Sequence, residues 1–230
     1  ALLARKEIQI NQAMKVGCTP LFIACQNDRM KVVNALLARK EIQINQAMDD
    51  GATPLFIACQ KDRVKVVNAL LAKKEIQINQ PMDDGVTPLY MACQNDHVKV
   101  VNALLARKEI HINQAANNGI TPLYIACSLD RVKVVNALLA RKEIQINQAQ
   151  NDGATPLFMA CQNDHVKVVN ALLARKEIQI NQAMNNGCTP LLITCQKGYV
   201  KVLILLLARK EIQINQRADD GATPLLAACQ

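Results

Sequence analysis

The sequence contains no tryptophan and only three tyrosines and three phenylalanines among its 230 residues. So few rings do not supply the row of stacking platforms with which proteins bind single-stranded nucleic acid. No apolar run approaches the roughly 20 residues that cross a bilayer, so no transmembrane helix is predicted. The eight glycines stand alone in the sequence, which argues against a glycine-rich loop that cradles a phosphate.

Groups that carry chemistry are equally sparse. The three histidines are isolated in sequence: His97, His111 and His165. Six residues separate Cys18 from Cys25, and Cys188 from Cys195, whereas zinc sites favour two to four. The sequence therefore predicts no enzyme, no metal site and no cofactor.

The most abundant feature of the chain is self-similarity. Seven glycines recur at a fixed spacing of 34 residues, and nearly the whole sequence recurs with them: Gly17, Gly51, Gly85, Gly119, Gly153, Gly187 and Gly221. We interpret residues 1–230 as one array with a partial repeat at each end (1–16 and 221–230) and six full repeats: 17–50, 51–84, 85–118, 119–152, 153–186 and 187–220. A fixed period of this size marks a repeat architecture. Near-identical repeats favour an extended binding surface over a single reaction centre.

Seven of the nine cysteines lie on the same period: Cys25, Cys59, Cys93, Cys127, Cys161, Cys195 and Cys229. Packed helices stand about 10 Å apart, and a disulfide needs Cα atoms within about 7 Å. We therefore expect these thiols to be buried, reduced and unbridged, as in a cytoplasmic protein. Cys18 and Cys188 fall elsewhere in the repeat and are predicted to be semi-exposed.

The formal charge of +8 suggests nucleic acid or an anionic membrane as a partner. The distribution argues against both, because residues 17–50 carry four basic and four acidic side chains. We interpret this pattern as a solvated surface and predict neither a nucleic-acid nor a membrane partner.

Each repeat divides into three parts, as residues 17–50 illustrate. Thr19-Pro20 is typical of a helix start, and the first helix is expected to end near Gln26-Asn27. The apolar stripe of Met30, Val33, Leu36 and Leu37 predicts a second helix. A segment of alternating polar and apolar residues follows at 41–45, and a polar turn at 49–51 closes the repeat. Both helices are too short to be stable alone, so only stacking can bury their stripes.

The repeat resembles the ankyrin repeat, in which a Gly and the motif Thr-Pro-Leu-His precede two antiparallel helices and a projecting β-turn. The matching residues are 51–55, Val66-Val67 and Leu70-Leu71 in the second helix, and Asn79 in the loop. The resemblance implies an all-α fold, an ankyrin-repeat solenoid of stacked helix-turn-helix units with projecting β-turn loops. Tetratricopeptide repeats also have 34 residues, but Thr-Pro at a helix start and a Gly turn in every copy argue against them.

The sequence departs from the family in three ways. The family's His is replaced by Phe, Tyr or Leu, so apolar packing is expected to fix that position. The repeat is one residue longer than usual near residues 39–41, so the second helix is expected to run on slightly or the loop to bulge. The Gly between the helices survives only at Gly198. Elsewhere an Asp such as Asp28 takes its place, and Asp tolerates a left-handed turn.

Comparison of the copies locates their variation at the turn tips, after the Gly and at the exit of the first helix. In ankyrin proteins these positions line the concave groove that holds partners, although drift at exposed loops predicts the same pattern. Val86, Tyr90, Ile120, Tyr124 and Leu129 form the most apolar stretch and suggest a central anchor patch. The candidate partner-binding residues are Asp83, Asp84, Val86, Tyr90, Gln94, Asn95, Asn117, Asn118, Ile120, Tyr124, Ser128, Leu129, Asn151 and Asp152.

The repeat 187–220 differs most from the others. Ile204 replaces an otherwise constant Asn that should face solvent, so either a neighbouring element covers it or the array ends nearby. Both ends of the sequence lack a polar capping repeat, which predicts head-to-tail self-stacking of molecules.

The sequence thus predicts an adaptor or scaffold that binds a protein partner through the groove of turn tips and first helices. Graded variation at the groove favours this function. The uniformity of the remaining positions favours an alternative, a structural spacer or elastic rod without a specific partner. A designed consensus repeat protein is a third interpretation.

Overall fold

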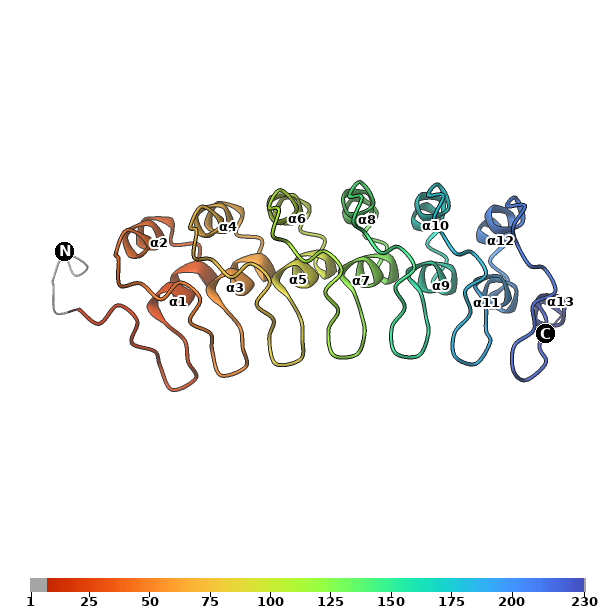
Figure 1. Cartoon of the computed structure of the whole chain (residues 1–230), viewed down its shortest axis with the longest axis horizontal. Helices are drawn as coiled ribbons and strands as arrows, with labels where there is room; N and C mark the ends of the chain where they lie inside the picture. Colours follow the sequence, from red (N-terminus) through yellow and green to blue (C-terminus); the bar gives the residue numbers. More distant parts are fainter. Residues whose placement is uncertain (1–7, 230) are drawn as a thin grey trace. The chain divides into compact units, whose positions relative to one another are not determined.

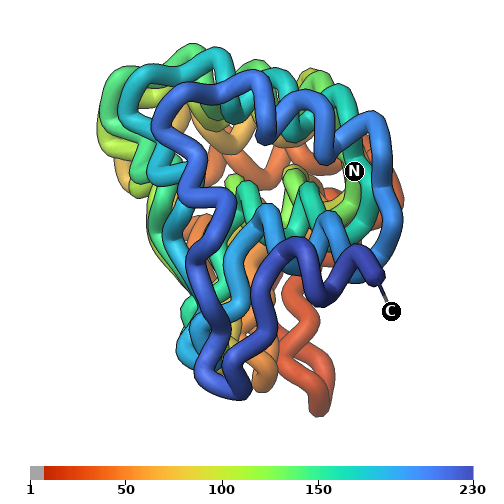
Figure 2. The backbone as a smooth tube through the Cα atoms, turned by 90° about the vertical axis from the view of Figure 1, so that its right-hand side faces the viewer, coloured from red at the N-terminus to blue at the C-terminus, as the bar shows by residue number. Residues whose placement is uncertain are grey.

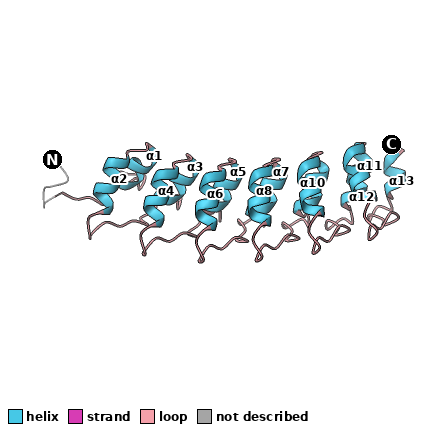
Figure 3. Ribbon diagram, turned by 90° about the horizontal axis from the view of Figure 1, so that it is seen from above, coloured by secondary structure: helices cyan, strands magenta, loops and turns pink. Residues whose placement is uncertain are grey.

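The computed structural model describes residues 8–229 and forms two compact units, Ala1–Asn117 (unit 1) and Asn118–Gln230 (unit 2). The described residues contain helices and loops but no strand (Figure 3). Unit 1 holds α1 (Pro20–Gln26), α2 (Met30–Leu37), α3 (Pro54–Gln60), α4 (Val64–Leu71), α5 (Pro88–Gln94) and α6 (Val98–Leu105). Unit 2 holds α7 (Pro122–Ser128), α8 (Val132–Leu139), α9 (Pro156–Gln162), α10 (Val166–Leu173), α11 (Pro190–Lys197), α12 (Val200–Leu207) and α13 (Pro224–Ala228).

Within each unit the odd-numbered first helices form one row and the even-numbered second helices form another (Figure 1). The loops that join successive repeats project beyond the row of first helices. In unit 2 the backbones of successive repeats follow nearly the same path (Figure 2). The predicted all-α architecture of stacked helix pairs with projecting loops is therefore confirmed.

The first helix begins as the sequence predicts. Thr53 is the N-cap of α3, and its hydroxyl accepts a hydrogen bond from the Phe56 N–H at 3.1 Å. Pro54 occupies the first helical position, where a missing N–H costs nothing. The turn after α3 requires a positive φ, and Asp62 supplies it at 54°. In unit 2 Asp130 and Asp164 supply it in the same way, and Gly198 does so after α11 at 66°. The prediction that Asp fills the left-handed position between the helices is confirmed.

The core lies between the two rows of helices. Leu55 and Phe56 of α3 and Val67 and Leu70 of α4 are at most 3 % exposed. Burial of such a side chain contributes about 1.5–3 kcal/mol. Stacking therefore stabilises helices of seven or eight residues, which would be marginal in isolation.

The extra residue of each repeat lies in a loop. Each second helix ends at a Leu such as Leu37, and the following Ala38 is its C-cap. A turn then forms in which the Ile42 N–H approaches the Arg39 carbonyl at 3.4 Å. The second helix therefore does not run on past Leu37, and of the two alternatives the change in the loop is the one observed.

Asparagine side chains join successive repeats. Asn45 Nδ2 donates to the Glu75 carbonyl at 2.8 Å, and its Oδ1 accepts from the Gln77 N–H at 2.9 Å. Asn11 and Asn79 make the same pair of bonds in unit 1, and Asn147 and Asn181 make them in unit 2. This asparagine ladder gives a physical reason for the asparagine of each copy, because the partners of its side chain are backbone groups of the next repeat.

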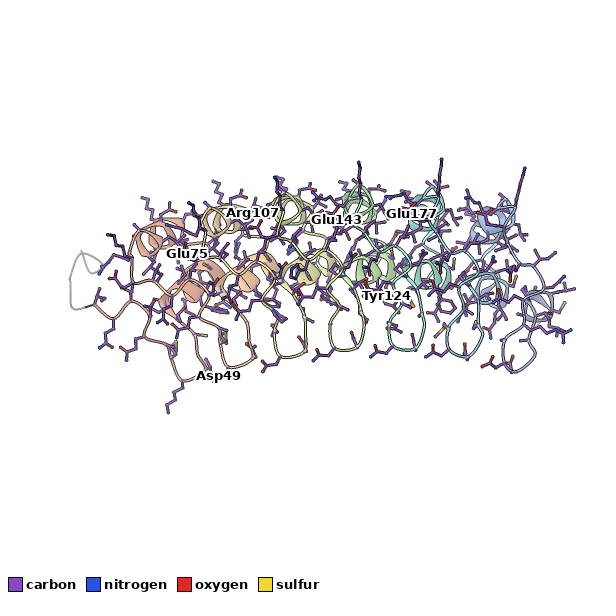
Figure 4. All side chains as sticks on the ribbon, in the orientation of Figure 1. Asp49, Glu75, Arg107, Tyr124, Glu143 and Glu177 are labelled. Carbon is purple, nitrogen blue, oxygen red and sulfur yellow. The ribbon has the colours of Figure 1, made fainter. Side chains whose placement is uncertain are left out.

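A second set of inter-repeat bonds covers the carbonyl ends of the second helices. Lys73 Nζ donates to the Leu37 carbonyl at 2.6 Å, and the Arg107 guanidinium donates to the Leu71 carbonyl. Arg107 also pairs with Glu109 at 2.6 Å. The backbone hydrogen bond of Glu109 and its bond from Arg107 hold the pKa of this carboxyl below its usual range. Figure 4 places Arg107 at the level of the second helices.

The cysteine prediction is correct for five of the seven periodic thiols. None of the nine cysteines forms a disulfide, and Cys25, Cys59, Cys93, Cys127 and Cys161 are buried. Burial raises the pKa of Cys25 and of Cys161 to about 12. Cys195 is only half-buried and Cys229 is exposed. Only the short helix α13 packs on α11 beyond Cys195, and no described residue stacks beyond Cys229. Cys18 and Cys188 are half-buried, as predicted.

The outer face of α12 is unusually apolar. Val200, Ile204 and Leu207 are 63 %, 62 % and 49 % exposed. No described element covers Ile204, which contradicts the first of the two expectations for this residue. The N-terminal partial repeat is described only from residue 8, so the expectation for the N-terminal end falls partly outside the described residues.

Candidate functional site

Each projecting loop ends in a tight turn whose geometry the sequence dictates. The Gly51 N–H donates to the Met48 carbonyl at 3.0 Å, and Asp50 Oδ1 accepts from the Ala52 N–H at 3.0 Å. Gly51 has a φ of 85°, and a Cβ there would lie 2.9 Å from the Cα of Met82. Glycine is therefore required both for the conformation and for the close approach of the next loop.

Successive tips are joined by backbone hydrogen bonds. The Asp83 N–H donates to the Asp50 carbonyl at 3.1 Å, and the Asn117 N–H donates to the Asp84 carbonyl at 2.9 Å. The tips of unit 1 therefore form a connected edge. Figure 4 shows Asp49 at this edge.

The first residue of the tip is Asp or Asn in every full repeat. Asn117 adds a side-chain bond to the edge, because its Nδ2 donates to the Asp83 carbonyl at 3.0 Å. Asn185 does the same to Asn151 in unit 2, at 3.1 Å. A carboxylate cannot donate, so Asp49 and Asp83 do not make this bond. Their exposed carboxylates face solvent.

A groove of about 360 Å³ lies in unit 1 between these tips and the first helices. Its apolar part includes Met48 and Met82 from the loops and Met91 from α5, all of them half-buried. Asp50 and Asp84 also line it, and both are exposed. The groove thus combines adaptable thioether side chains with carboxylates at its margin.

Hydrogen-bond donors contact the methionine sulfurs of the groove. Asn95 Nδ2 lies 3.4 Å and Gln60 Nε2 lies 3.9 Å from Met91 Sδ. Cys18 Sγ lies 3.6 Å from Met48 Sδ. These contacts position the flexible methionine side chains in the groove.

Two other hollows differ from this groove. In unit 2 a hollow of about 390 Å³ lies beside Asp219 and Asp220, and no methionine lines it. In unit 1 a hollow of about 400 Å³ lies beside Ile23 and Val32. The equivalent residues of the next repeat, Ile57 and Val66, are buried, so this hollow lies on a face that stacking buries elsewhere in the unit.

The predicted tyrosine anchors do not lie on the surface. Tyr90 and Tyr124 are only 7 % and 3 % exposed. Burial, together with the nearby carboxylate of Asp84, raises the pKa of Tyr90. The equivalent Phe56 and Phe158 are also buried, because this position of the first helix packs between repeats. The expectation of apolar packing at this position is confirmed, whereas an exposed anchor formed by the two rings is wrong.

The remaining predicted residues lie at tips and helix exits within their own units. In unit 1, Asp83, Asp84, Asn95 and Asn117 are exposed, and Val86 and Gln94 are half-buried. In unit 2, Asn118, Leu129, Asn151 and Asp152 are exposed, and Ile120 and Ser128 are half-buried.

Asp50 and the three groove methionines are not among the binding residues predicted from the sequence. The sequence signal for the methionines is variation at one loop position. Met48 and Met82 occupy it in unit 1, and the other full repeats have Ala116, Gln150, Met184 and Ala218 there.

The histidines between the helices have a structural contact. His97 Nδ1 lies 3.0 Å from the Cys59 carbonyl, and His165 Nδ1 lies 3.0 Å from the Cys127 carbonyl. In unit 1 Arg63 Nε donates to the Gln26 carbonyl at 3.2 Å from the same place in its repeat. These side chains therefore cap the first helix of the preceding repeat.

Within residues 8–229, no three His, Cys, Asp or Glu side chains are grouped to hold a metal ion. No helix in this part of the chain has the length and apolar character to cross a bilayer.

Comparison with known proteins is consistent with the observed repeats. A family model described as ankyrin repeats in three copies matches the chain at residues 1–82, 41–116, 76–150, 109–184 and 141–218. None of the curated proteins compared with the chain matches it.

Two solved structures illustrate the likeness of the fold. The ankyrin repeat domain of Bcl-3, described as a member of the IkappaB protein family, has 22 % sequence identity and a TM-score of 0.83, over 93 % of this chain and 95 % of that one. The human ASB11 ankyrin repeat domain has 24 % identity and a TM-score of 0.76, over 92 % of both chains.

Proposed function

The chain belongs to the ankyrin repeat family, and from this we propose that it is a non-enzymatic scaffold or adaptor that binds a partner protein along its turn tips and first helices. Ankyrin repeat domains are generally protein–protein interaction modules. The observation that carries the proposal is the groove of unit 1, where half-buried methionines lie beside exposed carboxylates. Binding surfaces are enriched in such adaptable side chains.

The proposed surface comprises the exposed and half-buried residues at tips and helix exits in each unit. Tyr90 and Tyr124 act there as buried supports of the first helices. The five buried cysteines, none of which forms a disulfide, favour a reducing intracellular compartment, and we propose a cytoplasmic location on that basis.

A spacer without a specific partner remains the second candidate. The observation that favours it is the asparagine ladder, since identical inter-repeat bonds recur along each unit and resist separation of the repeats. A spacer needs no groove, so the two functions differ in where contacts with other proteins form.

A photo-crosslinking experiment separates them. The cross-linking amino acid p-benzoylphenylalanine is placed at Val86 in the groove, or at the exposed Lys99 on α6 as a matched control. A scaffold predicts a discrete cross-linked protein from position 86 and none from position 99. Equal products from both positions, or none from either, would contradict the proposal and favour the spacer.

A further inference from the structure

The apolar groove of unit 1 has the dimensions of a side-chain pocket. Its volume of about 360 Å³ lies at the low end of the range of about 300–1,000 Å³ for ligand sites. It is bounded by two loops and the first helices, so a segment that lies across it can insert an apolar side chain between them. Methionine adapts its shape to such a side chain.

The charge at the margin of this groove has one sign. Asp50 and Asp84 line it, and the adjacent Asp49 and Asp83 are exposed at the same two tips. No Lys or Arg lines the groove. An apolar pocket beside several carboxylates is complementary to a segment that carries apolar and basic residues together.

The carboxylates differ in the acceptors that they offer. Asp50 and Asp84 each use Oδ1 to accept a hydrogen bond from a backbone N–H of their own turn, at 3.0 Å. Their Oδ2 atoms remain as acceptors for a partner. Asp83 offers both oxygens, and an arginine can engage both at once.

We propose that the unit 1 groove binds an extended segment of a partner protein in which an apolar side chain enters the methionine pocket and a neighbouring Arg or Lys pairs with Asp50, Asp83 or Asp84. This inference rests on the proposed function and specifies the chemistry of the partner. The hollow of unit 2 beside Asp219 and Asp220 differs from this groove, because no methionine lines it.

The chain itself provides conservative substitutions for a test. Asn118 and Asn186 occupy the place of Asp84, and their Oδ1 atoms accept the same turn bond at 3.0 Å. Asp50→Asn and Asp84→Asn therefore remove charge and retain the turn. Gln150 occupies the place of Met82, and its N–H makes the same backbone bond, at 3.0 Å. Met48→Gln with Met82→Gln therefore makes the pocket polar without loss of the loop.

The test is selection of a random 12-residue peptide library, displayed on phage, against the intact chain. The expected peptides contain a large apolar residue within a few positions of Arg or Lys. Their affinities are then measured by fluorescence anisotropy at two salt concentrations. Loss of two exposed ion pairs in Asp50→Asn/Asp84→Asn should weaken binding about tenfold and reduce its salt dependence. Met48→Gln/Met82→Gln should weaken it at least tenfold. Glu75→Gln, at an exposed carboxylate that does not line the groove, should leave it unchanged.

The outcomes separate this inference from the proposed function. Enrichment of neutral or acidic peptides, or of basic peptides that bind both groove variants as tightly as the unchanged chain, would overturn the inference and leave a protein-binding module. Failure to enrich any peptide would count against both. Circular dichroism of each variant confirms that a loss of binding does not reflect unfolding.

Discussion

Replacement of Asn79 by alanine is expected to weaken the connection between two repeats of unit 1. The side chain donates to the Glu109 carbonyl at 2.7 Å and accepts from the His111 N–H at 2.8 Å. Each hydrogen bond contributes about 0.5–1.5 kcal/mol net. The released backbone groups lie at exposed loops, where water can bind them. The expected loss of unfolding free energy is therefore about 2 kcal/mol, without a further desolvation penalty.

Asn79→Asp separates the contributions of the two bonds. The carboxylate retains an acceptor for the His111 N–H but cannot donate to the Glu109 carbonyl. We expect it to lose about 1 kcal/mol, roughly half of the alanine effect. Asn68→Ala is the matched control, because Asn68 is exposed on α4 and no side-chain hydrogen bond joins it to another repeat. Its effect should stay within about 0.5 kcal/mol.

Urea unfolding followed by circular dichroism gives the global stability. Amide hydrogen exchange at His111 gives the local stability, because repeat arrays open locally as well as globally. Exchange at His111 should be faster in Asn79→Ala than in Asn68→Ala. Equal unfolding free energies for these two variants, with unchanged exchange at His111, would refute the assignment of inter-repeat stability to the asparagine ladder.

Three further outcomes are expected. Lys73→Arg should retain the bond to the Leu37 carbonyl and add an ion pair with Glu75 like that of Arg107 with Glu109. Thermal unfolding should then show an unfolding free energy higher by about 0.2–1 kcal/mol. A decrease would show that the introduced arginine does not adopt the geometry of Arg107. Iodoacetamide labelling followed by mass spectrometry should modify Cys229 first, then the half-buried thiols, and last the five buried thiols, whose thiolates burial disfavours; rapid labelling of all nine would contradict the burial. Ile204→Asn should reduce self-association at rising concentration in sedimentation velocity, because it removes the centre of an exposed apolar face. If the chain self-associates and the variant sediments in the same way, the contact lies elsewhere, for example at the head-to-tail contact that the sequence predicts.

Local signals made the helices predictable. Thr53-Pro54 determines a helix start through one hydroxyl and one ring, and Asp62 determines the turn through its tolerance of a positive φ. Both effects involve only neighbouring residues, so they can be predicted from the sequence. The turn at Arg39–Ile42 was less certain, because a single extra residue can lengthen either a helix or a loop.

The candidate site was harder to predict, because stacking of the repeats decides which side chains are buried and which lie in the groove. Tyr90 is chemically suited to a binding surface, but its side chain is buried, as that of Phe56 is. The presence of Phe at the equivalent position was the available sign of burial. Conversely, Met48 and Met91 are 43 residues apart, and only stacking brings both to one groove. Cys195 and Cys229 were misassigned because periodicity predicts identical surroundings, whereas burial depends on the repeat that follows.

The two residues at each turn tip differ in how much the fold depends on their side chains. Asp84 and Asn118 close their turns with the same Oδ1 contact at 3.0 Å, so the charge at this position can change at little cost to the loop. The preceding position is different, because Asn117 adds an inter-repeat bond that an aspartate cannot make. Asp49 and Asp83 therefore forgo a stabilising contact that asparagine makes in the same chain. A gain from their exposed charge would offset this loss, and the basic, apolar segment proposed for the unit 1 groove supplies such a gain.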